Sequence, residues 1–190
     1  MHRTSESSAS PTAVRPEPDE HAPFYAAYVA RVPAGDLVEI LDGQIEETIR
    51  PLGSLSEEAA GFAYAPGKWT VRQVVGHVID AERVFSYRAL RFARGDATPL
   101  PGFDEQAWAR ASNADDRPLA DLLAEWLTVR AATVALLRSL SPEAWLRRGE
   151  ANGTPSTVRA LATILAGHEL HHRAVLEERY YPRIGRGVST

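Results

Sequence analysis

The sequence predicts an all-α protein: a four-helix bundle with one long loop that crosses between two of its helices. Apolar residues recur at helical spacing over four long segments, and no segment alternates apolar and polar residues as a half-buried strand would. A stretch rich in Pro and Gly separates the second segment from the third. Four amphipathic helices bury their apolar faces most simply against one another, which gives a bundle.

Composition limits the class of protein. The chain has 190 residues, of which 44% are hydrophobic and 24% charged, as in a single globular domain with a sizeable core. A net charge of -4 argues against a nucleic-acid surface, which needs clustered Lys and Arg. No apolar run approaches the roughly 20 residues that span a bilayer, and neither a secretory signal nor a cysteine is found. We therefore expect a cytoplasmic protein that binds neither nucleic acid nor membrane.

Both ends of the chain are expected to lie outside the domain. Residues 1–22 are rich in Ser, Pro and Glu, which predicts a disordered tail. The domain should cover residues 23–182, and residues 183–190 should form a second tail. An apolar segment that begins at Phe24 and ends at Pro33 predicts a short helix packed across the body of the domain.

The first two long helices have recognisable starts. One is expected from about Asp36 to Leu52, with Asp36 as its N-cap. The other begins at Thr70, where Thr70 and Gln73 match a capping box, and it should end at Gly95.

The other two long helices follow the crossing loop, which we place at residues 98–108. The third helix is expected over residues 118–140, and a short helical turn with Pro at its first position should start within residues 141–143. The last helix should run from residue 156 or 157 to residue 180, with Pro182 after its end.

The last predicted helix carries two histidines on its apolar face. The apolar stripe through Leu165 continues at His168 and His172 when it advances by alternating steps of three and four residues. Residues four apart lie one above the other on a helix, so both imidazoles can reach one ion. His171 is the ambiguous neighbour, because a stripe through Ile164 would include it. The spacing of four favours His172.

A third histidine, His77, lies on the apolar face of the second helix, after Val74. A single buried histidine is best explained by a structural hydrogen bond, since a buried polar group without a partner is costly. Three inward histidines favour a metal instead. Three neutral imidazoles suit Zn, Ni, Fe or Cu and leave a coordination position open for water or substrate. The sequence thus predicts a divalent-metal site on His77, His168 and His172.

The segment from His168 to His172 also matches the HExxH pattern of zinc metalloproteases. Such enzymes need a third ligand farther along the chain and a glutamate that acts as general base. The few residues after His172 contain no further histidine, and no strand is predicted that could pair with a peptide substrate. We therefore do not favour a protease.

The roles of four charged residues stay open at this point. Asp80 lies one turn beyond His77 and could orient a ligand, whereas Glu82 and Glu169 lie on other helical faces. The favoured interpretation of each carboxylate is a solvated group or a salt bridge between helices. Arg130 falls on the apolar stripe of the third helix, where it could bind a substrate carboxylate. A structural pairing of Arg130 with Asp80 or Glu82 is the favoured interpretation. The sequence identifies no catalytic or substrate-binding residue.

Several segments, taken in order, resemble the DinB/YfiT-like proteins of the DinB superfamily. Residues 66–70 and 76–82 resemble the start of that family's second helix, and residues 102–108 resemble its connecting loop. Residues 167–172 resemble the signature of its last helix. The likeness covers roughly residues 24–181, and the ordered set is more specific than any one of its parts.

The resemblance implies a metal-binding four-helix bundle with His77, His168 and His172 as ligands, in agreement with the helical faces. Family members of known activity include transferases and isomerases that use low-molecular-weight thiols such as bacillithiol, mycothiol or glutathione. In these enzymes the metal is thought to activate the thiol. This chain has no cysteine, so the thiol would come from outside.

We therefore expect a metal-dependent enzyme of the thiol S-transferase type that binds Zn or Ni and acts on a small-molecule substrate. A hydrolase that uses metal-bound water is one alternative, and a non-catalytic, stress-related metal-binding protein is another. The resemblance is compatible with a homodimer and also with a monomer.

Overall fold

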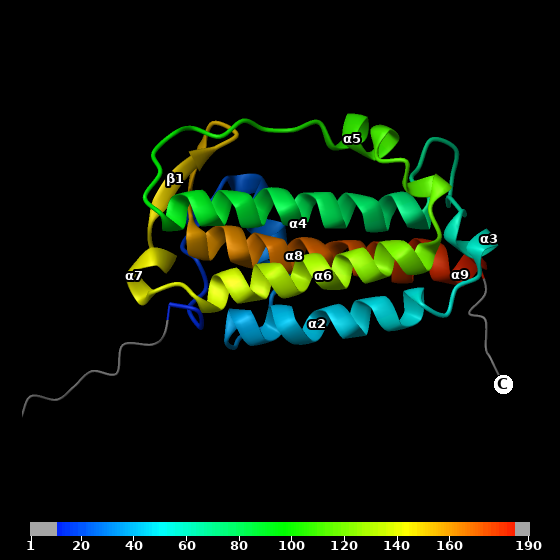
Figure 1. Ribbon diagram of the computed structural model, residues 1–190, viewed down its shortest axis with the longest axis horizontal. Helices are drawn as coiled ribbons and strands as arrows, with labels where there is room; N and C mark the ends of the chain where they lie inside the picture. The colour runs from blue at the N-terminus through cyan, green and yellow to red at the C-terminus, as the bar shows by residue number, and fades with distance from the viewer. Residues whose placement is uncertain (1–10, 185–190) are drawn as a thin grey trace, which may run out of the picture.

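Four long helices lie side by side and form the body of the molecule (Figure 1). The structure is a computed structural model and describes residues 11–184. The long helices are α2 (Leu37–Leu52), α4 (Val71–Ala93), α6 (Leu119–Arg138) and α8 (Val158–Val175). This arrangement confirms the predicted four-helix bundle. None of the helices in the described part of the chain is long and apolar enough to cross a membrane.

Shorter elements connect and extend these helices. They are the 3-10 turns η1 (Pro18–Glu20), η2 (Pro23–Tyr25) and η3 (Ala114–Asp116), the helices α1 (Ala26–Arg31), α3 (Glu57–Ala60), α5 (Glu105–Ala111), α7 (Pro142–Trp145) and α9 (Tyr181–Ile184), the π-helical turn η4 (Leu176–Tyr180), and the strands β1 (Arg148–Ala151) and β2 (Thr154–Thr157). The short helix expected before Pro33 and the turn expected around Pro142 are both confirmed as α1 and α7.

The predicted helix starts are confirmed by their caps. The Asp36 side chain accepts hydrogen bonds from two backbone N–H groups in the first turn of α2. Thr70 and Gln73 form the full capping box at the start of α4. Gly95 has a φ of 75°, a conformation that favours glycine, and it follows the last turn of α4.

The crossing loop decides the direction of the helices. It runs along the outside of α4 from one end of the bundle to the other and carries α5 near its far end (Figure 1). As a result α4 and α6 point in the same direction, opposite to α2 and α8. The helix α5 was not predicted, although Asp104 caps it with two hydrogen bonds to backbone N–H groups.

A two-stranded hairpin departs from the predicted all-helical pattern. The strands β1 and β2 pair antiparallel, and the turn between them contains Asn152 and Gly153 at φ values of 53° and 70°. Asn-Gly is the residue pair that this kind of tight turn prefers. The hairpin escaped prediction because strands of four residues carry no sustained apolar alternation.

The last helix also ends differently from expectation. The α-helical hydrogen bonds stop at Val175, and η4 and α9 continue the chain to Ile184. Pro182, which was expected to follow the helix, lies inside the first turn of α9. Proline is tolerated there because the first turn of a helix does not use its N–H groups.

The expected tail over residues 1–22 is wrong for residues 11–22, which pack on the bundle. Glu20 is buried and accepts hydrogen bonds from Thr157 (2.7 Å) and from Nε of Arg159 (3.1 Å). Arg15 donates to two backbone carbonyls near the end of α1, at 2.8 and 2.9 Å. Composition could not reveal this, because the partners of Glu20 lie more than a hundred residues away. The remainder of the two expected tails, residues 1–10 and 185–190, lies outside the described residues.

A buried guanidinium joins the four long helices. Arg130 on α6 donates to Glu82 on α4 (2.8 and 2.9 Å), to Glu169 on α8 (2.7 Å) and to the carbonyl of Leu41 on α2 (2.7 Å). Although burial opposes its charge, the carboxylates of Glu169 and Glu82 raise the pKa of Arg130 above its ordinary value. The predicted structural pairing of Arg130 with Glu82 is confirmed.

Other buried donors satisfy the two carboxylates. The indole N–H of Trp126 donates to Glu82 (3.1 Å), and the side chains of Gln44 and Thr48 donate to Glu169. These residues lie between two apolar clusters that fill the two ends of the bundle. We call this set, with Arg130, the central polar network.

Replacement of Arg130 by Met should strongly destabilise the protein, because it leaves two buried carboxylates without their cation. We expect a loss of about 3–5 kcal/mol in the free energy of unfolding, measured by urea denaturation. The control is Arg138→Met on the same helix, which breaks exposed pairs with Glu39 and Asp42 and should cost about 1 kcal/mol or less. Equal losses in the two variants would contradict a central role for Arg130.

Candidate metal centre

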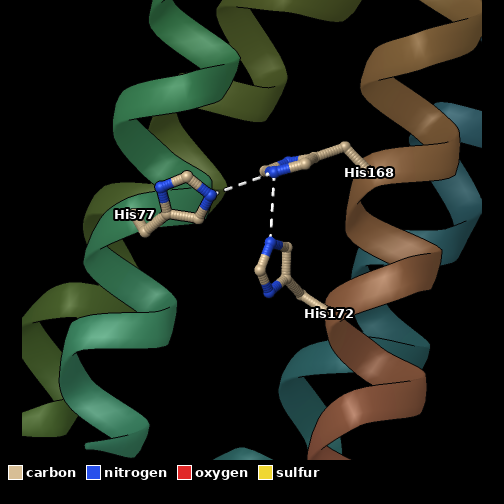
Figure 2. Close-up of side chains that lie close together, drawn as sticks. All are labelled: His77, His168 and His172. Atoms are coloured by element: carbon tan, nitrogen blue, oxygen red, sulfur yellow. Dashed lines mark hydrogen bonds between the residues drawn. The ribbon is translucent and has the colours of Figure 1, made fainter. Parts of the chain in front are cut away.

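Three histidine side chains from two neighbouring helices point toward one another (Figure 2). His77 comes from α4, and His168 and His172 come from successive turns of α8. Nε2 of His168 lies 3.0 Å from Nε2 of His77 and 3.1 Å from Nε2 of His172. One ring nitrogen from each residue lies within 4.8 Å of the other two. The structure thus brings together all three histidines that the sequence singled out, while their role as metal ligands stays a prediction.

Hydrogen bonds among the three histidines cannot satisfy all three of the Nε2 atoms that meet here. A ring nitrogen of a neutral imidazole carries either one hydrogen or one lone pair. Nε2 of His168 can therefore form one good hydrogen bond to a neighbouring histidine, but not two. A cation between the three nitrogens would accept all three lone pairs. Two nitrogens that share a tetrahedral zinc ion lie roughly 3.3 Å apart, which is close to the observed spacing. The donor set fits a divalent metal.

Burial keeps the three imidazoles neutral. It lowers the pKa of His77 to about 4, with a smaller effect from the neighbouring His171. Burial, reinforced by the other histidines, also lowers the pKa values of His168 and His172 well below 6.5. Neutral imidazoles carry the lone pairs that bind a metal, so near pH 7 the site does not have to lose protons first.

His171 lies outside this group. Its ring packs against Tyr28, with 5.2 Å between the ring centroids, and its side chain is only partly buried. This agrees with the choice of His172 over His171 from the helical spacing, because adjacent residues are turned by about 100° around a helix.

The nearby carboxylates do not contact the three histidines. In the part of the chain that the structure describes, no carboxylate forms a hydrogen bond with His77, His168 or His172, and Nδ1 of His172 is buried without a partner. Asp80, which was considered as an orienting group, instead lies 3.8 Å from Arg83. Glu169 belongs to the central polar network. Neither carboxylate is placed to act on the histidines.

An aromatic side chain covers one side of the histidine cluster. Trp69 packs against His77 and His172, with ring centroids 4.7 and 6.5 Å apart. The hydroxyl of Tyr180 donates to the backbone carbonyl of Trp69 (2.8 Å) and so fixes the segment that carries the indole. The indole thereby covers this side of the site.

A close backbone contact positions a second aromatic residue. A Cβ at position 167 would collide with the backbone of Tyr28, so only glycine allows α1 to lie this close to α8. The ring of Tyr28 then packs edge-on against His168, with 5.5 Å between the ring centroids. Gly167 thus sets the position of α1 beside the histidines.

A pocket of about 200 Å³ opens onto the histidine cluster and reaches His77 and His168. The other side chains that matter for its chemistry are Tyr25, Tyr28, Phe85, Arg88, Phe103 and Glu105. None of these residues was identified from the sequence as part of a site. For Phe85 and Arg88 a signal existed, since steps of four, four and three residues along α4 lead from His77 through Ala81 and Phe85 to Arg88.

Replacing any one of His77, His168 and His172 by Ala should abolish tight metal binding, because two imidazoles compete poorly with water for a dication. His171→Ala is the matched control and should keep a full equivalent of metal. The measurement is metal content by mass spectrometry, with folding checked by circular dichroism. Retained metal in His172→Ala together with loss in His171→Ala would show that the ligand set is wrong.

The metal-free protein should lose stability as the pH falls. The pKa of His77 is about 4 in the folded state against 6.5 for an exposed histidine, so between these values the unfolded chain binds more protons. The contribution of His77 to the free energy of unfolding is therefore fully present above pH 6.5 and is lost as the pH falls toward 4. For chelator-treated protein we expect the free energy of unfolding to fall between pH 7 and 5.5 by about 1 kcal/mol for this residue. In His77→Phe this pH-dependent loss should be smaller by that amount. The same pH profile in the variant and the wild type would show that His77 does not cause the loss.

Comparisons with known proteins agree with this geometry. Residues 40–176 match the model of the DinB superfamily. A protein of Bacillus licheniformis named "Putative metal-dependent hydrolase" is 35% identical over 126 residues, which cover 63% of this chain and 69% of the relative. A protein of Oceanobacillus iheyensis with the same description is 29% identical over 140 residues, which cover 72% of this chain and 78% of the relative.

A solved structure supports the fold. YfiT from Bacillus subtilis, described as a probable metal-dependent hydrolase with an unusual four-helix bundle topology, superimposes with a TM-score of 0.66 at 22% identity. The match covers 75% of this chain and 82% of YfiT. With the family match over most of the bundle and the relatives above, the chain is a member of the DinB superfamily.

Proposed function

We propose that the protein is a metal-dependent enzyme in which His77, His168 and His172 hold a Zn or Ni ion and the adjoining pocket holds a small-molecule substrate. One observation carries this proposal: three neutral imidazoles, two buried and one partly buried, converge beside a pocket that reaches two of them. Three protein ligands leave a coordination position open, which is typical of catalytic rather than structural zinc sites. The proposed setting is the cytoplasm, with the protein as a monomer or homodimer.

The favoured reaction is transfer of an external low-molecular-weight thiol to the substrate. When bound, a divalent metal supplies a Lewis acid that lowers the pKa of a coordinated thiol or water. A thiol starts from a pKa near 8.5 and needs little further help to lose its proton, whereas bulk water starts near 15.7. Among the described residues, no carboxylate reaches the histidines to act as a general base, which favours the thiol. Trp69 and Tyr28 place aromatic rings against two sides of the cluster, a setting that suits a substrate with apolar parts.

Hydrolysis is the second candidate, and the comparisons favour it. The similar proteins are named as metal-dependent hydrolases. In the HExxH interpretation Glu169 would serve as the base, but its carboxylate is bonded to Arg130, Gln44 and Thr48. A hydrolase built on this site would need another base, and Glu105 at the pocket is the carboxylate available there.

Titration of the Co²⁺-substituted protein with small thiols separates these functions. Bacillithiol, glutathione and 2-mercaptoethanol are the probes, and at least one should produce a sulfur-to-cobalt charge-transfer band in the ultraviolet. His171→Ala should keep this band, and His172→Ala should lose it together with the metal. Unchanged spectra with every thiol, on protein that holds a full equivalent of cobalt, would eliminate thiol activation and leave hydrolysis. A protein that binds no metal would overturn both thiol transfer and metal-dependent hydrolysis.

A further inference from the structure

Three arginines are buried in the part of the chain that the structure describes, and one of them has no acidic partner. Arg130 is paired with Glu82 and Glu169, and Arg159 with Glu20. Arg88 on α4 is 3% exposed, yet no described carboxylate lies within ion-pair distance of it. A buried charge without a counter-charge costs free energy, so such a residue calls for an explanation.

Among residues 11–184, the groups that contact Arg88 are neutral. One terminal nitrogen donates to the backbone carbonyl of Pro101 (2.7 Å), and the guanidinium lies 5.9 Å from the centroid of the Phe85 ring. The hydroxyl of Tyr25 also interacts with the guanidinium. Burial lowers the pKa of Arg88, but arginine keeps its proton at any physiological pH. The positive charge is therefore present and only partly satisfied.

Arg88 lines the same pocket that reaches His77 and His168. It lies eleven residues after His77 on α4, or about 16 Å along the axis, and side chains of a helix lean toward its N-terminus. The guanidinium is thus separated from the histidine cluster by the length of a small molecule. Aromatic side chains, among them Tyr28, Phe85 and Phe103, line the pocket with them.

We propose that Arg88, with the hydroxyl of Tyr25, binds a carboxylate at one end of the substrate while the other end reaches the metal centre. An arginine fork matches a carboxylate, and a tyrosine hydroxyl can donate to the same group. The substrate class is then a small monocarboxylate with an apolar middle. Glu105, exposed at the pocket, disfavours more highly charged anions such as phosphate dianions. This inference rests on the proposed function, since it specifies the substrate of that site.

The test compares two probes of the same shape on the metal-loaded, full-length protein. The probes are 3-phenylpropionate and its neutral amide, and the measurement is the dissociation constant by isothermal titration calorimetry. The wild type should bind the carboxylate about tenfold or more tightly than the amide, as expected for a charge-assisted hydrogen bond in a buried site. Equal affinities would overturn the proposal without any variant.

Arg88→Met should bring the ratio of the two affinities close to one, and Arg88→Lys should retain part of the preference. Arg83→Met is the matched control, because Arg83 lies on the same helix outside this pocket and should leave the ratio unchanged. Tyr25→Phe should reduce the ratio a few-fold. It is the substitute test if Arg88→Met does not fold. A ratio that stays at the wild-type value in folded Arg88→Met would show that the carboxylate binds elsewhere, for example on the metal.

Metal content is measured in parallel so that the two proposals can fail separately. A full equivalent of metal with no preference for the carboxylate leaves the metal-dependent function standing and removes the Arg88 site. A preference that depends on Arg88 in protein that takes up no metal supports the carboxylate site and removes the proposed chemistry.

Discussion

The hydrogen bonds of Arg130 to Glu82 and Glu169 fix the bundle at its centre, and the histidine cluster depends on them. The two glutamates lie on α4 and α8, the same helices that carry the histidines. Glu169 directly follows His168 in the chain. Because the guanidinium has directional donors, it fixes the relative height of these helices more tightly than apolar packing can. The polar network thus holds the three histidines in register.

The direction of the helices explains which segments line the pocket beside the histidines. The long loop between α4 and α6 returns along the outside of α4 and brings Phe103 and Glu105 to the pocket. A short connection in its place would have made α4 and α6 antiparallel and left this face of the bundle uncovered. The other side is filled by Trp69. The pocket beside the histidines is therefore lined by the loop and by α1 as well as by α4 and α8.

Local signals explain what could be predicted from the sequence. Helix starts such as Thr70 with Gln73 and the inward histidines depend on spacing along one segment, and both are visible without knowing the fold. The pair between Glu20 and Arg159 joins residues 139 positions apart, so composition suggested a tail instead. Arg88 could have been identified from helical spacing, because it lies on the same face of α4 as His77. That no carboxylate of residues 11–184 lies opposite it depends on tertiary packing, which spacing does not reveal.

The missing side chain at Gly167 also has an evolutionary consequence. Because the backbone of Tyr28 occupies the space that a Cβ would need, the residue at this position decides how near the first helix approaches the last. Tyr28 lies on that helix, Tyr25 directly precedes it, and both line the pocket. A homologue with alanine here would have to hold its first helix farther out and would have a wider entrance. The residue at position 167 therefore links the width of the pocket to the packing of α1, a helix that carries none of the three histidines.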